Sequence, residues 1–443
     1  MVRPLREFLR WEASGGVVLL LATAAALIWA NTDLVSYEEF WGEHLRIEIG
    51  GWTFDQDLRH LVNDGLMTLF FLVIGLEVKR ELAIGELRTR RAALLPVFAA
   101  GGGLLLPALA YLAVTAGRDG WEGWGIPVAT DTAFALGVLA LLGRVAPPAL
   151  TALLLAVAVI DDLGAMTVMT VFYSDGPDPV WIAVAVVCLV AVAAINRLHV
   201  RHILPYLLLG LAAWIATAAA GVHPTVIGVA LGLLTPARPF QQQVTVAAEA
   251  ERVAGNVEAT PDVADVNAAH WRRLALLSKE AISPVTRIEH ALHPWTSMLV
   301  VPLFALANAG IVLDTASIEA AASSAVTFGI IAGLVIGKPL GLLGGAWLAV
   351  RLGLSDRPRG VSWLHVAGLG GLAGIGFTIS LFVTNLAFED VATLSAAKVG
   401  ILAGSLMAAT LGVLILLVAG RRARAARARR DARAAAAAPA AAG

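Results

Sequence analysis

The sequence of 443 residues contains one cysteine, Cys188, and only 15% of its residues are charged. A single cysteine excludes an intrachain disulfide and a cysteine metal cluster. The chain also lacks a GxxxxGK[ST] loop, so a reaction driven by ATP would need a second subunit. The net charge of −1 says little by itself. We expect no nucleic-acid partner and no cofactor.

Apolar residues, in contrast, make up 58% of the sequence, and the mean hydropathy is +0.78. These values place the chain among polytopic membrane proteins. Apolar runs of roughly 17–25 residues predict an all-α fold of about twelve transmembrane helices in a lipid bilayer. The predicted spans are 14–31, 60–83, 92–116, 124–143, 149–173, 180–196, 203–221, 223–236, 292–312, 325–350, 362–387 and 396–419. The first could also be read as a signal peptide, but membrane rather than a secreted domain follows it.

Lysine and arginine are distributed unevenly between the two sides of this predicted bundle. With an even number of spans both termini share one side, which collects 27 of the 32 basic residues. Without the six in the long connection between the eighth and ninth spans, 21 remain against four on the opposite side. Because basic residues are retained in the cytoplasm, both termini are predicted to be cytoplasmic.

A short external segment, residues 44–59, alternates between polar and apolar residues around Gly50-Gly51. This pattern predicts a β-hairpin. Its expected use is pairing with a copy of itself, which would give a homodimer.

Two cytoplasmic segments are polar. The connection near 237–291 contains a polar stretch, 238–283, for which we expect a loop with some amphipathic helix. The tail, 421–443, is basic and Ala-rich, and we expect it to be disordered beside the anionic inner leaflet. The membrane domain therefore covers residues 1–420.

Asp161 and Asp162 are the only charged residues in the apolar run from Ala149 to Tyr173. The pair lies near the middle of the run, and a carboxylate at that depth costs roughly 2.5–3.5 kcal/mol. Such groups usually face a water-filled cavity on an ion or proton pathway. Adjacent helical residues project about 100° apart, so the two cannot act as one bidentate clamp. We therefore predict a cation and proton site in which the two aspartates have different roles.

Two predicted spans are interrupted by polar residues or glycines. The fourth contains the cluster 127–132, with Thr130 and Asp131, and the eleventh contains five glycines within 368–376. Such interruptions are tolerated where backbone is buried in protein or lines a cavity. They take matching places in spans three to five and ten to twelve, which is typical of inverted-repeat transporters with a midplane site. Close helix packing also selects glycine and is the alternative for the eleventh span.

Lys338 is the only cation of the tenth span, and its central position makes snorkelling to an interface awkward. Facing Asp161, it can titrate when the pairing breaks, so an approaching metal ion would compete with protons and with the ammonium. Hard oxygen ligands from the other aspartate, the backbone, and Thr130 or Asp131 suit Na⁺ or Li⁺, and ligand type alone does not exclude Ca²⁺. As a structural alternative, Asp131 and Lys338 would offset the partial charges at half-helix ends.

Seven segments, in order along the chain, carry a family resemblance. They are FFLVIGLEVKREL (70–82), ATDTAFALGVLALL (129–142), IDDLGA (160–165), RIEHALHPW (287–295), PLFALANAG (302–310), IGKPLG (336–341) and GIGFTIS (374–380). Together they are highly specific, and they run from the second predicted span to the eleventh. On these segments the chain resembles the NhaA family of sodium/proton antiporters.

The resemblance implies electrogenic exchange of cytoplasmic Na⁺ or Li⁺ for more than one external proton, by alternating access, in a bacterial inner membrane. It implies discontinuous fourth and eleventh helices that cross at the midplane. Inverted repeats are described in part from this family, so that pattern and the resemblance are not independent. Asp162 is then the main cation ligand, and Asp161 pairs with Lys338 and carries protons. Thr130 and Asp131 lie at the crossing.

The family's pH-sensing region matches charged residues near the cytoplasmic ends of two spans. They are Glu77, Lys79, Arg80 and Glu81 in the second span, and Arg287, Glu289, His290 and His293 before or at the start of the ninth. A solvated helix-end network is the alternative for this group, although histidine titrates in the right range. Thr286 stands where a relative has lysine, and the loop before it is longer. These departures concern the pH set point rather than the ion pathway.

Two other functions use carboxylates inside a membrane. An intramembrane aspartyl protease needs two aspartates that face each other and share a proton, whereas Asp161 and Asp162 are neighbours on one helix, so Asp131 would have to supply the second. A sodium-coupled solute symporter shares the broken helices, but no segment identifies an organic substrate. We therefore expect a secondary transporter of Na⁺, Li⁺ and H⁺, not an enzyme.

Overall fold

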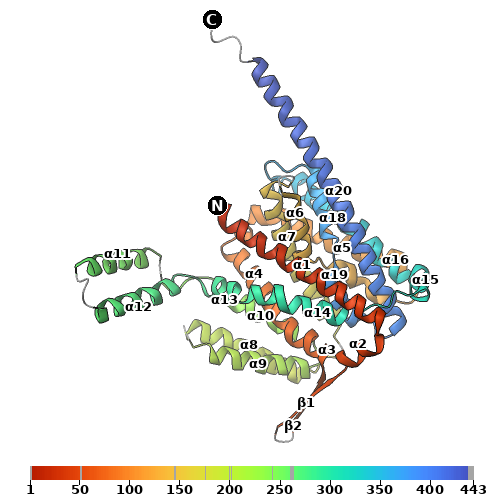
Figure 1. The fold of residues 1–443 in the computed structure, drawn as a ribbon, viewed down its shortest axis with the longest axis horizontal. Helices are drawn as coiled ribbons and strands as arrows, with labels where there is room; N and C mark the ends of the chain where they lie inside the picture. Colours follow the sequence, from red (N-terminus) through yellow and green to blue (C-terminus); the bar gives the residue numbers. More distant parts are fainter. Residues whose placement is uncertain are drawn as a thin grey trace.

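The computed structural model is a bundle of helices with a short β-hairpin at one end (Figure 1). It describes residues 2–49, 52–143, 146–174, 176–198, 200, 202–241, 243–259 and 264–437. The predicted hairpin turn at Gly50-Gly51 and the last part of the predicted tail, 438–443, lie outside the described residues.

Eight helical segments of the described chain are long and apolar enough to cross a membrane. They are α1 (Val2–Thr32), α3 (Leu58–His60) continuing into α4 (Met67–Ala83), α5 (Arg90–Thr115), α7 (Pro148–Phe172), α8 (Pro179–Arg197), α13 (Pro284–Trp295) continuing into α14 (Val301–Asn308), α16 (Ala325–Ala332) continuing into α17 (Lys338–Arg351), and α20 (Val391–Ala437). Two bent helix pairs raise the number to ten if each is one span: η3 (Trp121–Val128) with α6 (Thr132–Leu142), and α18 (Trp363–Ala373) with α19 (Phe377–Ala387). Two apolar helices are shorter, α9 (Leu204–Ala219) and α10 (Thr225–Leu234). A mostly helical multi-pass fold is therefore confirmed, and the total of twelve spans stays a prediction.

Three of the long helices contain a π-helical turn. The turns are η1 (Leu61–Leu66), η5 (Thr296–Val300) and η6 (Gly333–Gly337). Pro302 and Pro339 follow η5 and η6 closely, where proline cannot donate to the regular helical ladder. Because π turns are rare and often lie at functional sites, the helices that carry them are candidates for the site.

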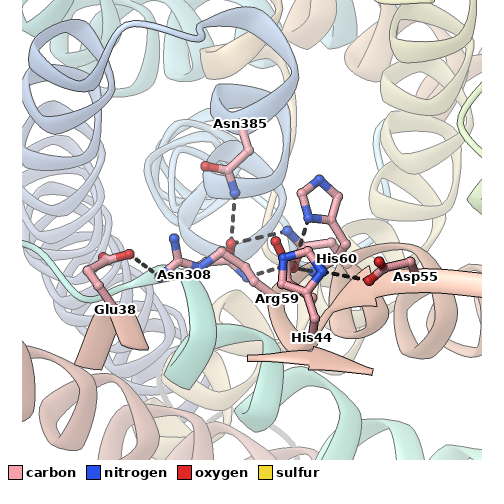
Figure 2. A network of polar contacts seen from close by, with 9 residues as sticks. Glu38, His44, Asp55, Arg59, His60, Asn308 and Asn385 are labelled. Atoms are coloured by element: carbon pink, nitrogen blue, oxygen red, sulfur yellow. Dashed lines mark hydrogen bonds and ion pairs between the residues drawn. The ribbon is translucent and has the colours of Figure 1, made fainter. Parts of the chain in front are cut away.

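The predicted β-hairpin is confirmed as an antiparallel pair of strands, β1 (His44–Ile49) and β2 (Trp52–Asp57). It follows the short helix α2 (Leu34–Trp41). Near its base the Arg59 guanidinium donates to Glu38 Oε2 at 2.9 Å (Figure 2). The hairpin is thus tied to α2, and its role in a dimer stays a prediction.

Helix α2 also holds the end of α14. The Tyr37 hydroxyl donates to the Leu306 carbonyl at 2.8 Å and accepts from the Gly310 N–H at 3.2 Å. Burial raises the pKa of Tyr37 to about 12, so its hydroxyl stays protonated and able to donate at neutral pH.

The connection before the predicted ninth span differs from the expectation. Helix α13 (Pro284–Trp295) begins eight residues before the predicted start near 292, because Ser283 caps it by accepting from the Thr286 N–H at 3.3 Å. Its first turns are polar, so hydropathy alone does not reveal them. The polar stretch before it holds α11 (Gln243–Ala259) and α12 (Ala264–Glu280), which pack together and project from the bundle (Figure 1).

The tail also differs from the expected disorder. Helix α20 continues through residue 421 to Ala437, since alanine and arginine both have high helix propensity. The remaining short helices of the described chain are η2 (Glu86–Arg88) and α15 (Thr315–Ser323).

Close glycine contacts bring α17 (Lys338–Arg351) against α5. A Cβ added at Gly102 would collide with the Gly341 carbonyl, and one at Gly341 would collide with the Gly102 carbonyl. Small residues allow backbones in a membrane to approach this closely. One residue on, Gly103 faces Lys338 and Asp161, each 3.8 Å from the position of a Cβ. The glycines therefore allow α17, which carries Lys338, to pack closely against α5.

Candidate cation and proton site

The breaks in the two bent helix pairs lie against each other. The first pair bends by 40° and the second by 48°. Across the gap, the Asp131 N–H donates to the Ile375 carbonyl at 2.6 Å. The Ser380 hydroxyl donates to the Ile126 carbonyl at 2.7 Å. Backbone groups freed by each break therefore find partners on the other, as the interrupted sequence patterns require.

Asp131 caps both of the half-helices that begin at the breaks. Its Oδ1 accepts from the Phe134 N–H of α6 at 3.1 Å. Its Oδ2 accepts from the Thr378 N–H of α19 at 3.1 Å and from the Thr378 hydroxyl at 2.6 Å. A carboxylate at a helix N-terminus is favourable because the N-terminal N–H groups carry partial positive charge. This geometry matches the structural alternative for Asp131.

Lys338 is fully buried and pairs with Asp161. Its ammonium lies 2.9 Å from Asp161 Oδ2, and neither side chain is exposed. It also donates to the Val128 carbonyl at 2.5 Å, at the C-terminal end of η3. The lysine thus balances one aspartate and the negative end of one half-helix at once.

Thr130 links this ion pair to the second break. Its hydroxyl oxygen lies 2.9 Å from Asp161 Oδ2 and 2.9 Å from the Ala373 carbonyl, and it can donate to one of them at a time. Asp161 Oδ1 is buried, and no residue that the structure describes forms a hydrogen bond with it. Asp161 is therefore held on one oxygen only.

Asp162 has a different environment from its neighbour. Its side chain lines a cavity of about 70 Å³ that lies between α1, α4, α6, the α13–α14 segment and α19, and its Oδ1 has no hydrogen-bond partner in the described part of the chain. A cavity of this size has room for water beside polar groups. The other polar side chains that line it are Glu77, Asp131, Thr132, His293, Thr296, Ser297 and Thr378. The two aspartates thus face different surroundings, as their spacing on a helix predicts.

The predicted pH-sensing residues are only partly brought together. Arg80 pairs with the buried carboxylate of Glu289 at 2.6 Å and lies 3.7 Å from Glu81. His290 and His293 are close enough to Glu289 to interact with it electrostatically. Glu77 and His293 also line the Asp162 cavity.

Two of the predicted residues stand apart from this group. Among the described residues, neither Lys79 nor Arg287 forms an ion pair, and the Arg287 guanidinium instead donates to the Lys279 carbonyl at 3.3 Å.

Sequence reasoning did not assign roles to Thr378 and Ser380. Both directly follow the glycine-rich stretch 368–376, which was singled out for its backbone, and both are buried. A hydroxyl residue directly after a helix interruption is the signal that was available, since such residues commonly hold freed backbone groups.

The fold and the site together define a multi-pass membrane transporter: two broken helices meet at a buried aspartate–lysine pair beside a cavity that Asp162 and other polar side chains enter. The family model Na⁺/H⁺ antiporter 1 matches residues 6–416. The chain is 45% identical over 417 residues to the Na⁺/H⁺ antiporter NhaA 2 of Sorangium cellulosum, which covers 93% of this chain and 89% of that protein. It is 44% identical over 416 residues to the Na⁺/H⁺ antiporter NhaA of Janthinobacterium sp. strain Marseille, covering 92% and 91%.

The chain therefore belongs to the Na⁺/H⁺ antiporter 1 family, the NhaA antiporters, which are transporters rather than enzymes. General descriptions of inverted-repeat transporters with discontinuous helices rest in part on this same family.

Proposed function

We propose that the protein exports cytoplasmic Na⁺ or Li⁺ in exchange for more than one external proton, electrogenically and under control of pH. In a bacterial inner membrane this activity serves sodium and pH homeostasis. The observation that carries the proposal is the unequal environment of the two neighbouring carboxylates. Asp161 forms an ion pair with Lys338, while Asp162 faces the cavity.

The architecture that supports this activity has twelve spans and cytoplasmic termini. In it the α9 and α10 helices each cross the membrane, and each bent pair is one discontinuous span. The two discontinuous spans cross at the midplane as equivalent members of two inverted repeats. Their mutual hydrogen bonds support this arrangement.

Exchange follows from competition for the same oxygens. Na⁺ entering the cavity binds the Asp162 carboxylate, with hydroxyl or carbonyl oxygens completing a hard-ligand shell. Na⁺ displaces the proton that Asp162 holds in the absence of the metal ion, and the added positive charge weakens the hold of Asp161 on the Lys338 ammonium, which releases a second proton. When protons return from the external side, the ion pair forms again and Na⁺ is displaced. Asp131 and Thr130 hold the two breaks in register during these steps.

The charged group around Arg80 and Glu289 is proposed to set the pH dependence. Two of the predicted pH-sensing residues, Glu77 and His293, line the same cavity as Asp162. A change in the charge of this group would therefore alter the electrostatic potential that a cytoplasmic cation meets there. The hairpin is proposed to pair with a second copy, and the basic tail to lie near anionic lipid.

The direct test uses everted vesicles that hold the protein and a pre-formed pH gradient. Adding Na⁺ or Li⁺ should dissipate the gradient. Asp162→Asn should abolish the response, whereas the exposed helix cap Asp314→Asn should retain it, because asparagine caps as well as aspartate. A response that requires an added organic solute would instead favour the symporter, and near-normal exchange by Asp162→Asn would refute the site.

A further inference from the structure

Three asparagines form a hydrogen-bonded cluster on the side of the site that faces the β-hairpin. Asn63 lies in η1, Asn308 ends α14 and Asn385 lies in α19. We call them the asparagine triad. Figure 2 shows Asn385 pointing at Asn308.

Asn308 is the hub of the asparagine triad. Its amide nitrogen donates to Asn63 Oδ1 at 2.8 Å and to the Phe304 carbonyl at 2.9 Å. Its Oδ1 accepts from the amides of Asn385 at 2.8 Å and Asn63 at 3.3 Å. The side chain is 1% exposed, so all of its donors and acceptors are satisfied without solvent.

A second layer, made of three phenylalanines, belongs to the same helices. Phe71, Phe304 and Phe382 come from α4, α14 and α19, and each is at most 2% exposed. The Phe382 ring centroid lies 5.7 Å from that of Phe71 and 6.1 Å from that of Phe304. We call these three the phenylalanine layer.

Both layers lie on one side of the Asp162 cavity. On each of the three helices, a cavity-lining residue is seven positions from the member of the asparagine triad, or about 10 Å along a helix. These cavity residues are Phe70, Val301 and Thr378. The cavity extends in the opposite direction, toward His293 and Ser297. The asparagine triad therefore lies on the hairpin side of the cavity, and the phenylalanine layer borders the cavity on that side, with Phe71 directly after the cavity-lining Phe70.

We infer that the asparagine triad and the phenylalanine layer are the gate that closes the site on the hairpin side and opens in the other state of the cycle. The inference rests on the proposed function, because alternating access requires one such seal, and on the proposed orientation, in which the hairpin side is external. The phenylalanine layer excludes hydrated ions. The amide side chains hold the helices together by hydrogen bonds, and on opening they can exchange these bonds for hydrogen bonds to water. A purely apolar seal or an ion pair would not allow this as readily.

Paired amides also join membrane helices in static packing, but they suit a surface that has to separate better than an apolar core does. Three amides between packed helices are useful for stability only while every group is paired, and an apolar set of the same size would pack there without that requirement. A gate, in contrast, needs groups that are satisfied both when the helices are together and when water enters between them.

The test places single cysteines in a Cys188→Ser background and labels them with a membrane-impermeant maleimide from the hairpin side. Phe382→Cys should be protected at rest and labelled when a Na⁺ gradient drives turnover. Ser297→Cys, in the cavity, should be labelled from the opposite side at rest and less during turnover. Phe71→Cys is a second reporter of the gate if Phe382→Cys does not fold.

A second comparison requires no turnover. Adding Asn308→Ala to the Phe382→Cys reporter should raise labelling from the hairpin side about tenfold, the change that about 1.4 kcal/mol makes in an equilibrium constant. The matched control is Asn196→Ala. It also removes a side-chain amide, one that donates to the Leu234 carbonyl at 2.9 Å and does not belong to the asparagine triad. It should leave labelling unchanged.

Three results would overturn the gate: equal labelling of Phe382→Cys with and without turnover, no labelling while exchange proceeds, or equal effects of the two alanine variants. Failure of the proposed function has a different signature. The same vesicles would show no Na⁺- or Li⁺-dependent proton movement, while the contrast between Asn308→Ala and Asn196→Ala would still report whether the layers seal the site.

Discussion

Replacing Asp131 with asparagine separates its structural role from a role as cation ligand. The carboxylate accepts three hydrogen bonds from the starts of two half-helices, one through Phe134 and two through Thr378. Asparagine has one acceptor oxygen, and its amino group must then point at one of these donors. One capped helix end would lose both its cap and its negative charge.

The expected cost follows from these two losses. A lost cap costs about 0.5–2 kcal/mol, and charge at a partly buried helix N-terminus contributes up to about 2 kcal/mol, so Asp131→Asn should lower the free energy of unfolding by about 0.5–4 kcal/mol. If Asp131 only holds the breaks together, the maximal exchange rate should fall while the apparent KM for Na⁺ changes little.

Unfolding of the purified protein in detergent and vesicle exchange over a range of Na⁺ concentrations measure the two quantities. Asp162→Asn is the contrasting variant: it should abolish exchange without a comparable loss of stability, since one buried oxygen of the Asp162 carboxylate forms no hydrogen bond with any described residue. The reasoning would be refuted if Asp131→Asn kept full stability and raised the KM for Na⁺ tenfold or more, because Asp131 would then be a direct ligand.

Three further predictions concern other parts of the molecule. Lys338→Arg should keep the fold but change the pH profile of exchange, because guanidinium stays protonated; an identical profile would leave Lys338 as a structural counter-charge. Arg80→Gln removes the partner of the buried Glu289 carboxylate and should also shift the pH profile, with Na⁺ affinity at the optimum retained; an unshifted profile would assign the pair to helix-end structure alone. Deleting residues 44–57 should convert a dimer to a monomer in size-exclusion chromatography with light scattering, and a persisting dimer would place the interface elsewhere.

The helices and the buried charges of this protein are strongly encoded in local sequence. A long apolar run that spans a bilayer singly must satisfy its own backbone groups as a helix, so ten of the predicted runs are found as helices, and the fourth and eleventh as two helical pieces each. A charge in the middle of such a run must face protein or water, which singled out Asp161, Asp162 and Lys338. The hairpin was also predictable, because its alternation has a period of two.

Helix boundaries and the contacts between distant residues were harder to predict from the sequence. The polar start of α13 is fixed by a Ser-Pro cap rather than by hydropathy, and the tail is helical through the propensity of alanine and arginine. The contact of Thr378 with Asp131 joins residues 247 positions apart, and no local pattern encodes that distance. The asparagine triad is hidden for the same reason, since its members lie on three separate helices.

The most direct test of the exchange mechanism is calorimetry of Na⁺ binding to the purified protein in buffers of different ionisation enthalpy. If the metal ion and protons compete for the Asp161 and Asp162 oxygens, the apparent heat should vary with the buffer and report net release of protons, and Asp162→Asn should show neither binding nor release. Na⁺ binding whose heat is the same in every buffer would mean that no proton leaves, and would contradict the mechanism.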